Sequence, residues 1–211
     1  LGEFMNNLIK YLFSFLFLFF FISCEKKDSQ GPIKIAAIEP LSGPYAAVGN
    51  DLITQVEFYT QEINRNGGVL GGRKIEIVRM DNANKAEKTT ELVRKSIDDG
   101  IRFIIQGGGS HVAKSIITQL KKHNSRNPGK EVLYLNHSAV TPSFTNEDCT
   151  FFHFRFDANT DMKVAGLVQE ISQDKEVNKV YLFNQNYAFG QSIKKTARKL
   201  LNERVPRVKI V

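Results

Sequence analysis

The chain has 211 residues, of which 42% are apolar, 24% charged and 10% aromatic, so disordered, collagen-like and low-complexity classes are excluded. Lys and Arg number 29 against 22 for Asp and Glu, which gives a formal net charge of +7. The basic residues are mixed with acidic ones on expected helix faces, and no nucleic-acid-binding motif accompanies them. We therefore expect no nucleic-acid partner.

Residues 1–24 have the pattern of an export signal. The residues before Met5, the expected natural start, are interpreted as an expression-vector remnant or a misplaced start. One cation, Lys10, precedes an apolar run over residues 11–22, which is shorter than the roughly 20 residues that span a bilayer. Ser23 supplies the small residue that a cleavage site needs. The sequence therefore predicts an exported protein.

Cys24 ends a short stretch that resembles the lipobox of bacterial lipoproteins. In that class the matching cysteine is lipidated and becomes the new N-terminus, which implies a membrane anchor at Cys24. Phe21 and Ile22 depart from the usual Leu and small residue, and the alternative is a buried cysteine in an ordinary signal or an uncleaved anchor. The polar residues 25–32 are expected to tether a folded domain to the membrane.

Short apolar runs alternate with longer periodic segments from residue 33 onward. Apolar runs bounded by turn residues indicate buried strands, and apolar residues at helical spacing indicate amphipathic helices. Glycine and asparagine are dense over residues 64–72, and Gly100 follows a periodic segment, so both are expected to end helices. The predicted order is strand 33–39, a helix ending at Ile63, strand 73–81, helix 85–99, strand 101–106, helix 112–123 and strand 132–136.

Residues 151–156 have two interpretations, a strand at a sheet edge or a crossing between two lobes. Beyond them the pattern predicts helix 161–172, strand 179–183, helix 192–202 and a strand over 208–211. Strands alternating with helices imply right-handed crossovers and a mostly parallel sheet covered on both faces. We expect an α/β fold with an N-terminal ligand-binding lobe over 33–156 and an incomplete second lobe over 157–211.

Three stretches resemble the type I periplasmic solute-binding proteins of branched-chain amino acid uptake systems: IKIAAIEPLSGPYAAVG over 33–49, EINRNGGVLGGRKIEIVRMD over 62–81 and YLFNQNYAFGQS over 181–192. The second is the most specific, because a helix end, paired glycines and a strand ending in Asp81 follow in the family's order and spacing. The resemblance implies two hinged lobes of Rossmann-like topology that trap a small molecule. It also implies partners, namely an ABC permease and a separate ATPase.

Ser110 follows a buried strand and three glycines and precedes a helix. Its hydroxyl and the first free amides of that helix point at one spot, which favours a carboxylate. The resemblance implies the same role, since the family binds the ligand's carboxylate here. The alternative is a helix-capping serine without a ligand. Gly107, Gly108 and Gly109 either let the backbone approach a ligand closely or form a flexible loop.

The loop over residues 137–142 follows the next strand and ends at the same edge of the sheet. The resemblance implies that its carbonyls and hydroxyls hold the ligand's ammonium group, with Ala139 and Thr141 at the matching positions and Ser138 beside them. Ser42, in the first loop after strand 33–39, is a further candidate for ligand contact.

Tyr187 and Phe189 precede Gly190 in the second lobe, where the family presents an aromatic ring that closes over the ligand. Phe189 replaces the common tyrosine, so a hydroxyl contact is lost unless Tyr187 supplies it; either ring could instead pack in the core. In the first lobe Val48 occupies a position that is often aromatic, and Tyr45 is the nearby candidate. These departures affect the side-chain pocket and leave the ligand's identity open.

Residues 108–115 have nearly the spacing of a nucleotide-binding Walker loop, but Ala113 stands where that loop requires glycine. The four histidines show no metal-ligand spacing, and catalytic triad and nucleophile-elbow patterns are absent. We predict no enzyme activity, no metal and no cofactor. Cys149 is expected to be a small buried residue, with an intermolecular disulfide or a free thiol as the alternatives.

Together these observations predict an exported protein, membrane-anchored or periplasmic, that captures a small amino acid or related carboxylate for an ABC transporter. The alternative is an extracellular sensory module, because the same fold serves as the ligand-binding region of receptors. Neighbouring permease and ATPase genes would favour transport, and a neighbouring kinase gene would favour sensing.

Overall fold

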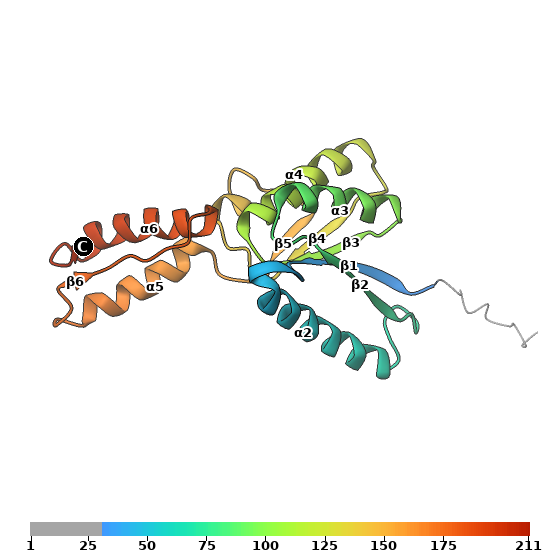
Figure 1. Ribbon diagram of the computed structural model, residues 1–211, viewed down its shortest axis with the longest axis horizontal. Helices are drawn as coiled ribbons and strands as arrows, with labels where there is room; N and C mark the ends of the chain where they lie inside the picture. Colours follow the sequence, from blue (N-terminus) through green and yellow to red (C-terminus); the bar gives the residue numbers. More distant parts are fainter. Residues whose placement is uncertain (1–30) are drawn as a thin grey trace, which may run out of the picture. The chain divides into compact units, whose positions relative to one another are not determined.

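The computed structural model describes residues 31–211 (Figure 1). The predicted export signal, the lipidation candidate Cys24 and all but the end of the predicted tether lie outside the described residues. Between residues 31 and 211, no helix has the length and apolar character needed to cross a membrane.

A five-stranded parallel sheet forms the first part of the fold. Its strands lie in the order β2-β1-β3-β4-β5, and every neighbouring pair is parallel. The strands are β1 (Ile33–Glu39), β2 (Ile75–Asp81), β3 (Phe103–Gln106), β4 (Leu133–Asn136) and β5 (His153–Arg155). The predicted α/β class with a parallel sheet is confirmed, and residues 151–156 contain the edge strand of that sheet.

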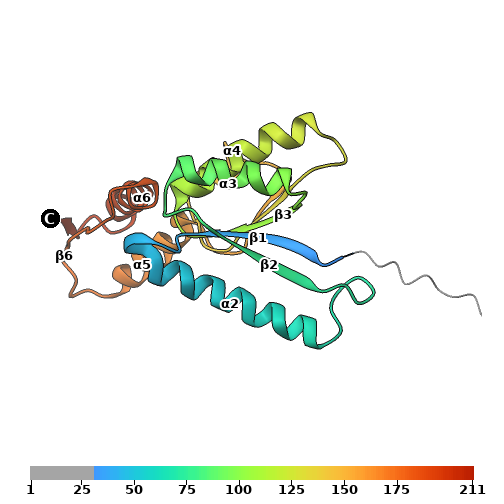
Figure 2. The ribbon, with the colours of Figure 1, turned by 45° about the vertical axis from the view of Figure 1, so that its right-hand side comes forward.

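Helices cover both faces of this sheet. Helix α2 (Ala46–Arg65) lies on one face, and α3 (Ala86–Asp98) and α4 (Ser110–Arg126) lie on the other, as Figures 1 and 2 show. The side under α3 and α4 holds the main hydrophobic core, in which Ile38 and Tyr134 are completely buried. Strands covered in this way have almost continuous apolar sequences, which is why the runs were recognisable.

Helix α2 ends where the segment rich in glycine and asparagine begins. Asn66 follows its last residue, and Gly67 and Gly68 take positive φ angles of 102° and 80°. A Cβ on Gly68 would lie 2.2 Å from the carbonyl oxygen of Arg73, so the chain can turn into β2 only with glycine there. The predicted end of this helix is confirmed to within two residues.

Two helices and a two-stranded parallel sheet form a second group. Helix α5 (Thr160–Gln173) packs against α6 (Ala188–Arg204), and β6 (Lys179–Val180) pairs with β7 (Lys209–Ile210). The core of this group consists of Val164, Val168, Ala197, Leu200, Leu201, Val205 and Val208, and among the described residues it shares no member with the main core. The predicted lobe boundary after residue 156 falls between the two groups and stays a prediction.

Two elements of the second group differ from their predicted extent. Helix α6 begins four residues before the predicted start at Ser192, because Gly190 lies in its first turn instead of the preceding loop. A Cβ on Gly190 would lie 1.9 Å from the carbonyl oxygen of Gln185, so the loop folds back onto the helix. Strand β6 is shorter than the predicted strand 179–183, since its described partner β7 contributes only two residues.

The expectation of a buried Cys149 is wrong. Cys149 is exposed, and no disulfide partner lies within the described part of the chain. It sits in a turn after the short 3₁₀ helix η2 (Pro142–Thr145), where its amide donates to the carbonyl of Asn146 at 3.1 Å. Backbone hydrogen bonds hold this turn at the surface, and the Cys149 side chain is exposed there although it is small and apolar.

Candidate ligand-binding site

The carboxyl ends of β1, β3 and β4 place three loops at one edge of the sheet. Strand β2 pairs with one side of β1 and β3 with the other, so the direction of the strand order reverses between β1 and β3. In open parallel sheets such a reversal opens the crevice where ligands bind. The loops there span residues 40–45, 107–109 and 137–141, which are the loops that the sequence singled out.

Glu39, the last residue of β1, connects two of these loops. Its side chain is almost completely buried, and its Oε1 accepts a hydrogen bond from the Gly107 amide at 2.7 Å. Oε2 accepts from the Gly108 amide at 3.0 Å, and Oε1 also lies 2.7 Å from Nε2 of His137. A carboxylate has no proton to donate, so Nε2 of His137 is the donor. One carboxylate therefore holds the loop after β3 to the loop after β4.

Gln106, the last residue of β3, fixes the same glycine loop from inside the sheet. Its Nε2 donates to the Gly108 carbonyl at 2.7 Å, and its Oε1 accepts from the Tyr134 hydroxyl at 2.6 Å. Burial, and after it the charge of Glu39, raises the pKa of Tyr134 well above its usual range, so the phenol keeps its proton and remains a donor. Buried polar groups paired in this way specify one geometry.

Asn136, the last residue of β4, fixes the following loop. Its Oδ1 accepts from the amides of Ser138 and Ala139, and its Nδ2 donates to the Ala139 carbonyl at 2.8 Å. Nδ2 also lies 3.2 Å from Nε2 of His153. Burial lowers the pKa of His153 below its usual value, which favours the neutral imidazole that can accept this bond. All hydrogen-bonding positions of the buried Asn136 amide are used.

Gly107 and Gly108 make room for these bracing side chains. A Cβ on Gly107 would lie 2.3 Å from Cε1 of His137, and one on Gly108 would lie 2.6 Å from Oε2 of Glu39. Contacts this short do not occur, so any larger residue would displace the side chain of His137 or Glu39. The structure thus gives these two glycines a third role, beside the predicted alternatives of close ligand approach and flexibility.

Ser110 is the first residue of α4 and does not cap it. The N-cap position is occupied by Gly109, whose φ angle is 96°, and no side-chain cap bond forms. Ser110 is buried, and its hydroxyl forms no hydrogen bond with another residue of the described chain. The first-turn amides of a helix lack intrahelical partners and lie at the positive end of its dipole. Ser110 therefore stands where an anion would be favoured.

Ser42 is exposed in the loop after β1 and donates to Oδ2 of Asp81 at 2.7 Å. Asp81, the last residue of β2, also accepts from the Leu41 amide at 2.9 Å, the Ala83 amide at 2.8 Å and the Lys88 ammonium at 3.1 Å. Burial would raise the pKa of Asp81, but these hydrogen bonds together lower it far below its usual range. The Ser42 hydroxyl is thus committed as a donor to Asp81 and can offer a ligand only its lone pairs.

Thr141, at the end of the loop after β4, keeps an unused polar atom. Its Oγ1 is buried and has no hydrogen-bond partner in residues 31–211. Its carbonyl accepts from Nη1 of Arg155 at 3.0 Å. By contrast, the Ser138 hydroxyl lies 3.2 Å from Nδ1 of His137, and both backbone groups of Ala139 are bonded. An unpaired buried hydroxyl is costly, so Thr141 is the residue of this loop whose side chain most needs a partner.

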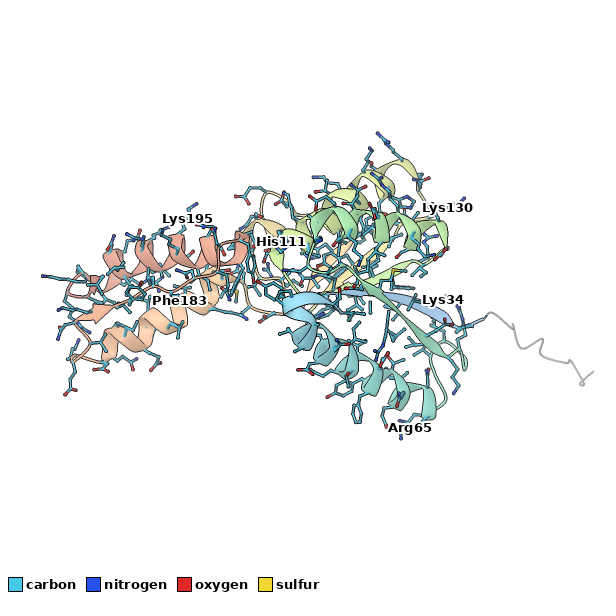
Figure 3. All side chains as sticks on the ribbon, in the orientation of Figure 1. Lys34, Arg65, His111, Lys130, Phe183 and Lys195 are labelled. Atoms are coloured by element: carbon cyan, nitrogen blue, oxygen red, sulfur yellow. The ribbon has the colours of Figure 1, made fainter. Side chains whose placement is uncertain are left out.

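The predicted aromatic residues meet at the start of α6. The Tyr187 ring lies 5.3 Å between centroids from His111 of α4 and 6.2 Å from Phe189, and Figure 3 labels His111 at this junction. Burial, and after it the neighbouring Tyr45, raises the pKa of the Tyr187 phenol. His111 Nε2 donates to the carbonyl of Asn84 at 3.0 Å. The structure therefore brings Tyr45, Tyr187 and Phe189 into one neighbourhood.

A hollow of about 480 Å³ lies elsewhere, between the η2 loop and helices α5 and α6. Its lining includes Thr141, Lys195 and Lys199 but no residue of the loops after β1 and β3, so it is not the predicted crevice. Figure 3 labels Lys195 on α6. In the described part of the chain, no group of three or more His, Cys, Asp or Glu residues is placed to hold a metal ion.

The family described as periplasmic binding protein matches residues 32–208. This chain belongs to the periplasmic binding protein family. A relative of this periplasmic binding protein, the Leu/Ile/Val-binding protein homolog 4 of Brucella abortus, is 38% identical over 170 residues, which cover 80% of this chain and 40% of the relative. The chain therefore spans less than half the length of that relative.

Solved structures of other binding proteins share the fold. The leucine-, isoleucine-, valine-, threonine- and alanine-binding protein of Brucella ovis, in a closed conformation, matches this periplasmic binding protein with a TM-score of 0.75 at 35% identity, covering 86% of this chain and 47% of the other. The branched-chain amino acid transporter substrate-binding protein of Streptococcus pneumoniae, in complex with isoleucine, matches with a TM-score of 0.72 at 20% identity over 85% and 48%. At that identity the second match shows the fold alone.

These comparisons confirm the predicted family. The relatives are named as binding proteins and not as enzymes, which agrees with the prediction of no enzyme activity. Family membership also places this periplasmic binding protein outside the cytoplasm.

Sequence reasoning missed the three braces of the site, Glu39, Gln106 and Asn136. A signal was present, because each is the polar last residue of an otherwise apolar strand, in the runs IKIAAIE, FIIQ and LYLN. All three residues are at most 1% exposed. A polar residue at the carboxyl end of a buried parallel strand is therefore a sign of a side chain that organises the following loop.

Proposed function

We propose that this chain forms the ligand-capturing part of a substrate-binding protein of an ABC transporter, and that its ligand is a small amino acid. The observation that carries the proposal is a pair of hydroxyls at the sheet edge that have no partner within residues 31–211, the hydroxyl of the buried residue Ser110 at the start of α4 and the buried Oγ1 of Thr141. Ser110 directly follows one loop and Thr141 ends another, and buried side chains hold both loops in place, so the two groups are preorganised for a polar ligand.

The two groups suit the two ends of an amino acid. The ligand's carboxylate would accept hydrogen bonds from the Ser110 hydroxyl and the first-turn amides of α4. Its ammonium group would donate to Oγ1 of Thr141 and to the second lone pair of the Ala139 carbonyl. The ligand's side chain would face Tyr45 and Tyr187. The names of the two Brucella relatives, at 38% and 35% identity, support a small amino acid as the ligand class.

The proposal extends to export and attachment. Cys24, in its lipobox-like stretch, would carry the lipid anchor, and the polar residues after it would separate the binding lobe from the membrane. A permease would then receive the ligand from the tethered protein. These statements rest on the sequence pattern and on the family, and they are independent of the ligand contacts proposed above.

Calorimetric titration of the protein, in a form as long as its relatives, tests the ligand contacts. Leucine, isoleucine, valine, threonine and alanine are the probes. Ser110→Ala removes one hydrogen bond to a charged group, which we expect to weaken binding by about 1 to 3 kcal/mol, or roughly 5- to 150-fold. Ser125→Ala is the matched control, because Ser125 is an exposed serine near the other end of the same helix.

The control variant is expected to bind as tightly as the wild type. An unchanged dissociation constant in Ser110→Ala would remove Ser110 from the site. Absence of binding to all five amino acids by the wild type would contradict the proposed ligand class.

A further inference from the structure

Glu39 carries a buried carboxylate that is not among the proposed ligand contacts. The Glu39 side chain is 2% exposed, and its ion-pair neighbour His137 carries a charge only when it is protonated. Burying a carboxylate is costly unless it is fully hydrogen-bonded. Its three bonds go to the Gly107 amide, the Gly108 amide and His137, and all three partners belong to the loops that border the crevice.

We infer that Glu39 is a positioning residue, which sets the spacing of the two ligand loops, and that this role requires a carboxylate. The loop after β3 leads directly into Ser110, and the loop after β4 leads into Thr141. Because one carboxylate holds both loops, it fixes the distance between the two proposed ligand groups. The effect on affinity rests on the proposed function, whereas the effect on loop geometry does not.

The pattern of donors explains why an amide cannot replace the carboxylate. Oε1 faces two donors, the Gly107 amide and His137 Nε2, and Oε2 faces a third, the Gly108 amide. Glutamine at position 39 has one acceptor oxygen and one NH₂ group. Whichever way its amide is turned, the NH₂ group faces a backbone N–H, and at least one buried donor loses its acceptor.

The two glycines support the same inference. Both glycines leave space that the side chains of Glu39 and His137 occupy. A Cβ on Gly108 would lie 2.6 Å from Oε2 of Glu39, and one on Gly107 would lie 2.4 Å from Nδ1 of His137. The loop sequence is thus fitted to the carboxylate and its imidazole partner. Gln106 holds the Gly108 carbonyl at 2.7 Å from the other side, so only the amide side of the loop depends on Glu39.

Amide hydrogen exchange of the 211-residue chain without ligand tests the local role. In Glu39→Gln we expect the Gly107 and Gly108 amides to exchange about 5- to 150-fold faster than in the wild type, because their acceptors are disrupted. The amides of β1, which lies between β2 and β3, should keep their protection. Glu76→Gln is the matched control, since Glu76 is an exposed glutamate on the neighbouring strand β2, and it should leave both sets unchanged.

A pair of variants at His137 keeps the test decisive if Glu39→Gln does not fold. The His137 side chain is 23% exposed, so its replacement is tolerated more easily. His137→Gln retains an N–H that can donate to Glu39, whereas His137→Leu has none. We expect His137→Gln to keep the wild-type affinity and the wild-type exchange rates of the Gly107 and Gly108 amides. In His137→Leu we expect weaker binding and faster exchange of these amides. If His137 served overall stability alone, the leucine variant would have a lowered melting temperature. A normal melting temperature of that variant, together with wild-type behaviour of the glutamine variant, therefore indicates the local role.

Titration of the form as long as its relatives, with the amino acids named above, separates the positioning role of Glu39 from the proposed binding of amino acids. Weaker binding in Glu39→Gln, at temperatures far below its melting point, supports the positioning role. Unchanged glycine exchange, or an unchanged dissociation constant where the wild type binds, overturns it. If the wild type binds no amino acid but Glu39→Gln still accelerates exchange at Gly107 and Gly108, the proposed function fails and the bracing role stands.

Discussion

Gly109 illustrates how the backbone of one residue controls the candidate site. Its φ angle of 96° lies where residues with a side chain are rarely found, and a Cβ there would lie 2.8 Å from Oδ1 of Asn84. Because Gly109 is the N-cap of α4, this conformation also directs the first turn of the helix and Ser110 with it. A substitution at this position therefore acts on both stability and the proposed ligand group.

We predict that Gly109→Ala lowers the free energy of unfolding by about 1 to 3 kcal/mol, the usual cost of a strained backbone conformation. Gly166→Ala is the matched control. Gly166 lies inside α5 with nothing within 4 Å of an added Cβ, so alanine there should stabilise the protein by about 0.5 to 1 kcal/mol. Urea unfolding of both variants measures the difference. Equal stability of Gly109→Ala and wild type would show that the loop adapts without strain.

The sequence placed Ser110 after a glycine loop and Ser138, Ala139 and Thr141 in the next loop, all at one edge of the sheet, and the structure has them there, with Ser110 as the first residue of α4. The sequence could not show which polar groups lack a hydrogen-bond partner within the protein. That depends on partners distant in the sequence, such as Asp81 for the Ser42 hydroxyl and Glu39 for the Gly107 amide, 68 residues away. Contacts of ligand with these residues stay predictions.

The elements themselves were predictable where apolar patterns are strong. Strands β1 to β4 and helices α3 and α4 lie within two or three residues of their predicted ranges, and β5 lies in residues 151–156, for which an edge strand was one of two interpretations. The start of α6 was not predictable, because Gly190 has the local signature of a loop and its place in the helix follows from packing against Gln185. A close contact between two backbone segments only five residues apart thus decided where α6 begins.

The group of α5 and α6 allows a test of the predicted lobe boundary. Leu201 is 2% exposed in the core of this group, and truncation to alanine should cost about 2 to 5 kcal/mol. If residues 157–211 form a separate lobe, Leu201→Ala should accelerate amide exchange in α5 and α6 and leave the strands β1 and β3 protected. Leu167→Ala is the control, because Leu167 is 65% exposed on α5.

Native-state hydrogen exchange reads out both variants. Equal acceleration in the two groups would mean that the described chain opens as one unit, which would contradict a boundary after residue 156. Thr160 connects the groups, since its hydroxyl lies 3.1 Å from the Val140 carbonyl and 3.0 Å from the Ser192 hydroxyl. This contact and the ring contact between His111 and Tyr187 are routes by which a cooperative opening would spread.

For the whole molecule, the family and the parallel α/β architecture followed from sequence, and the match over residues 32–208 confirms the family. The chain covers 40% to 47% of the two Brucella proteins that support the ligand class, so the activity and partners of the whole protein remain proposals. The sensory alternative and the lipid anchor at Cys24 likewise stay predictions. Their test lies in the neighbouring genes and in the leader, outside residues 31–211.

The proposed ligand site lies at the edge of the five-stranded sheet, where two loops converge. A crystal structure of the protein at the length of its relatives, grown with a bound amino acid, would locate the ligand. We expect the ligand's carboxylate within hydrogen-bond distance of the Ser110 hydroxyl and its ammonium group beside Oγ1 of Thr141. An amino acid held instead in the hollow between η2 and α6, with Ser110 contacting no ligand atom, would contradict it.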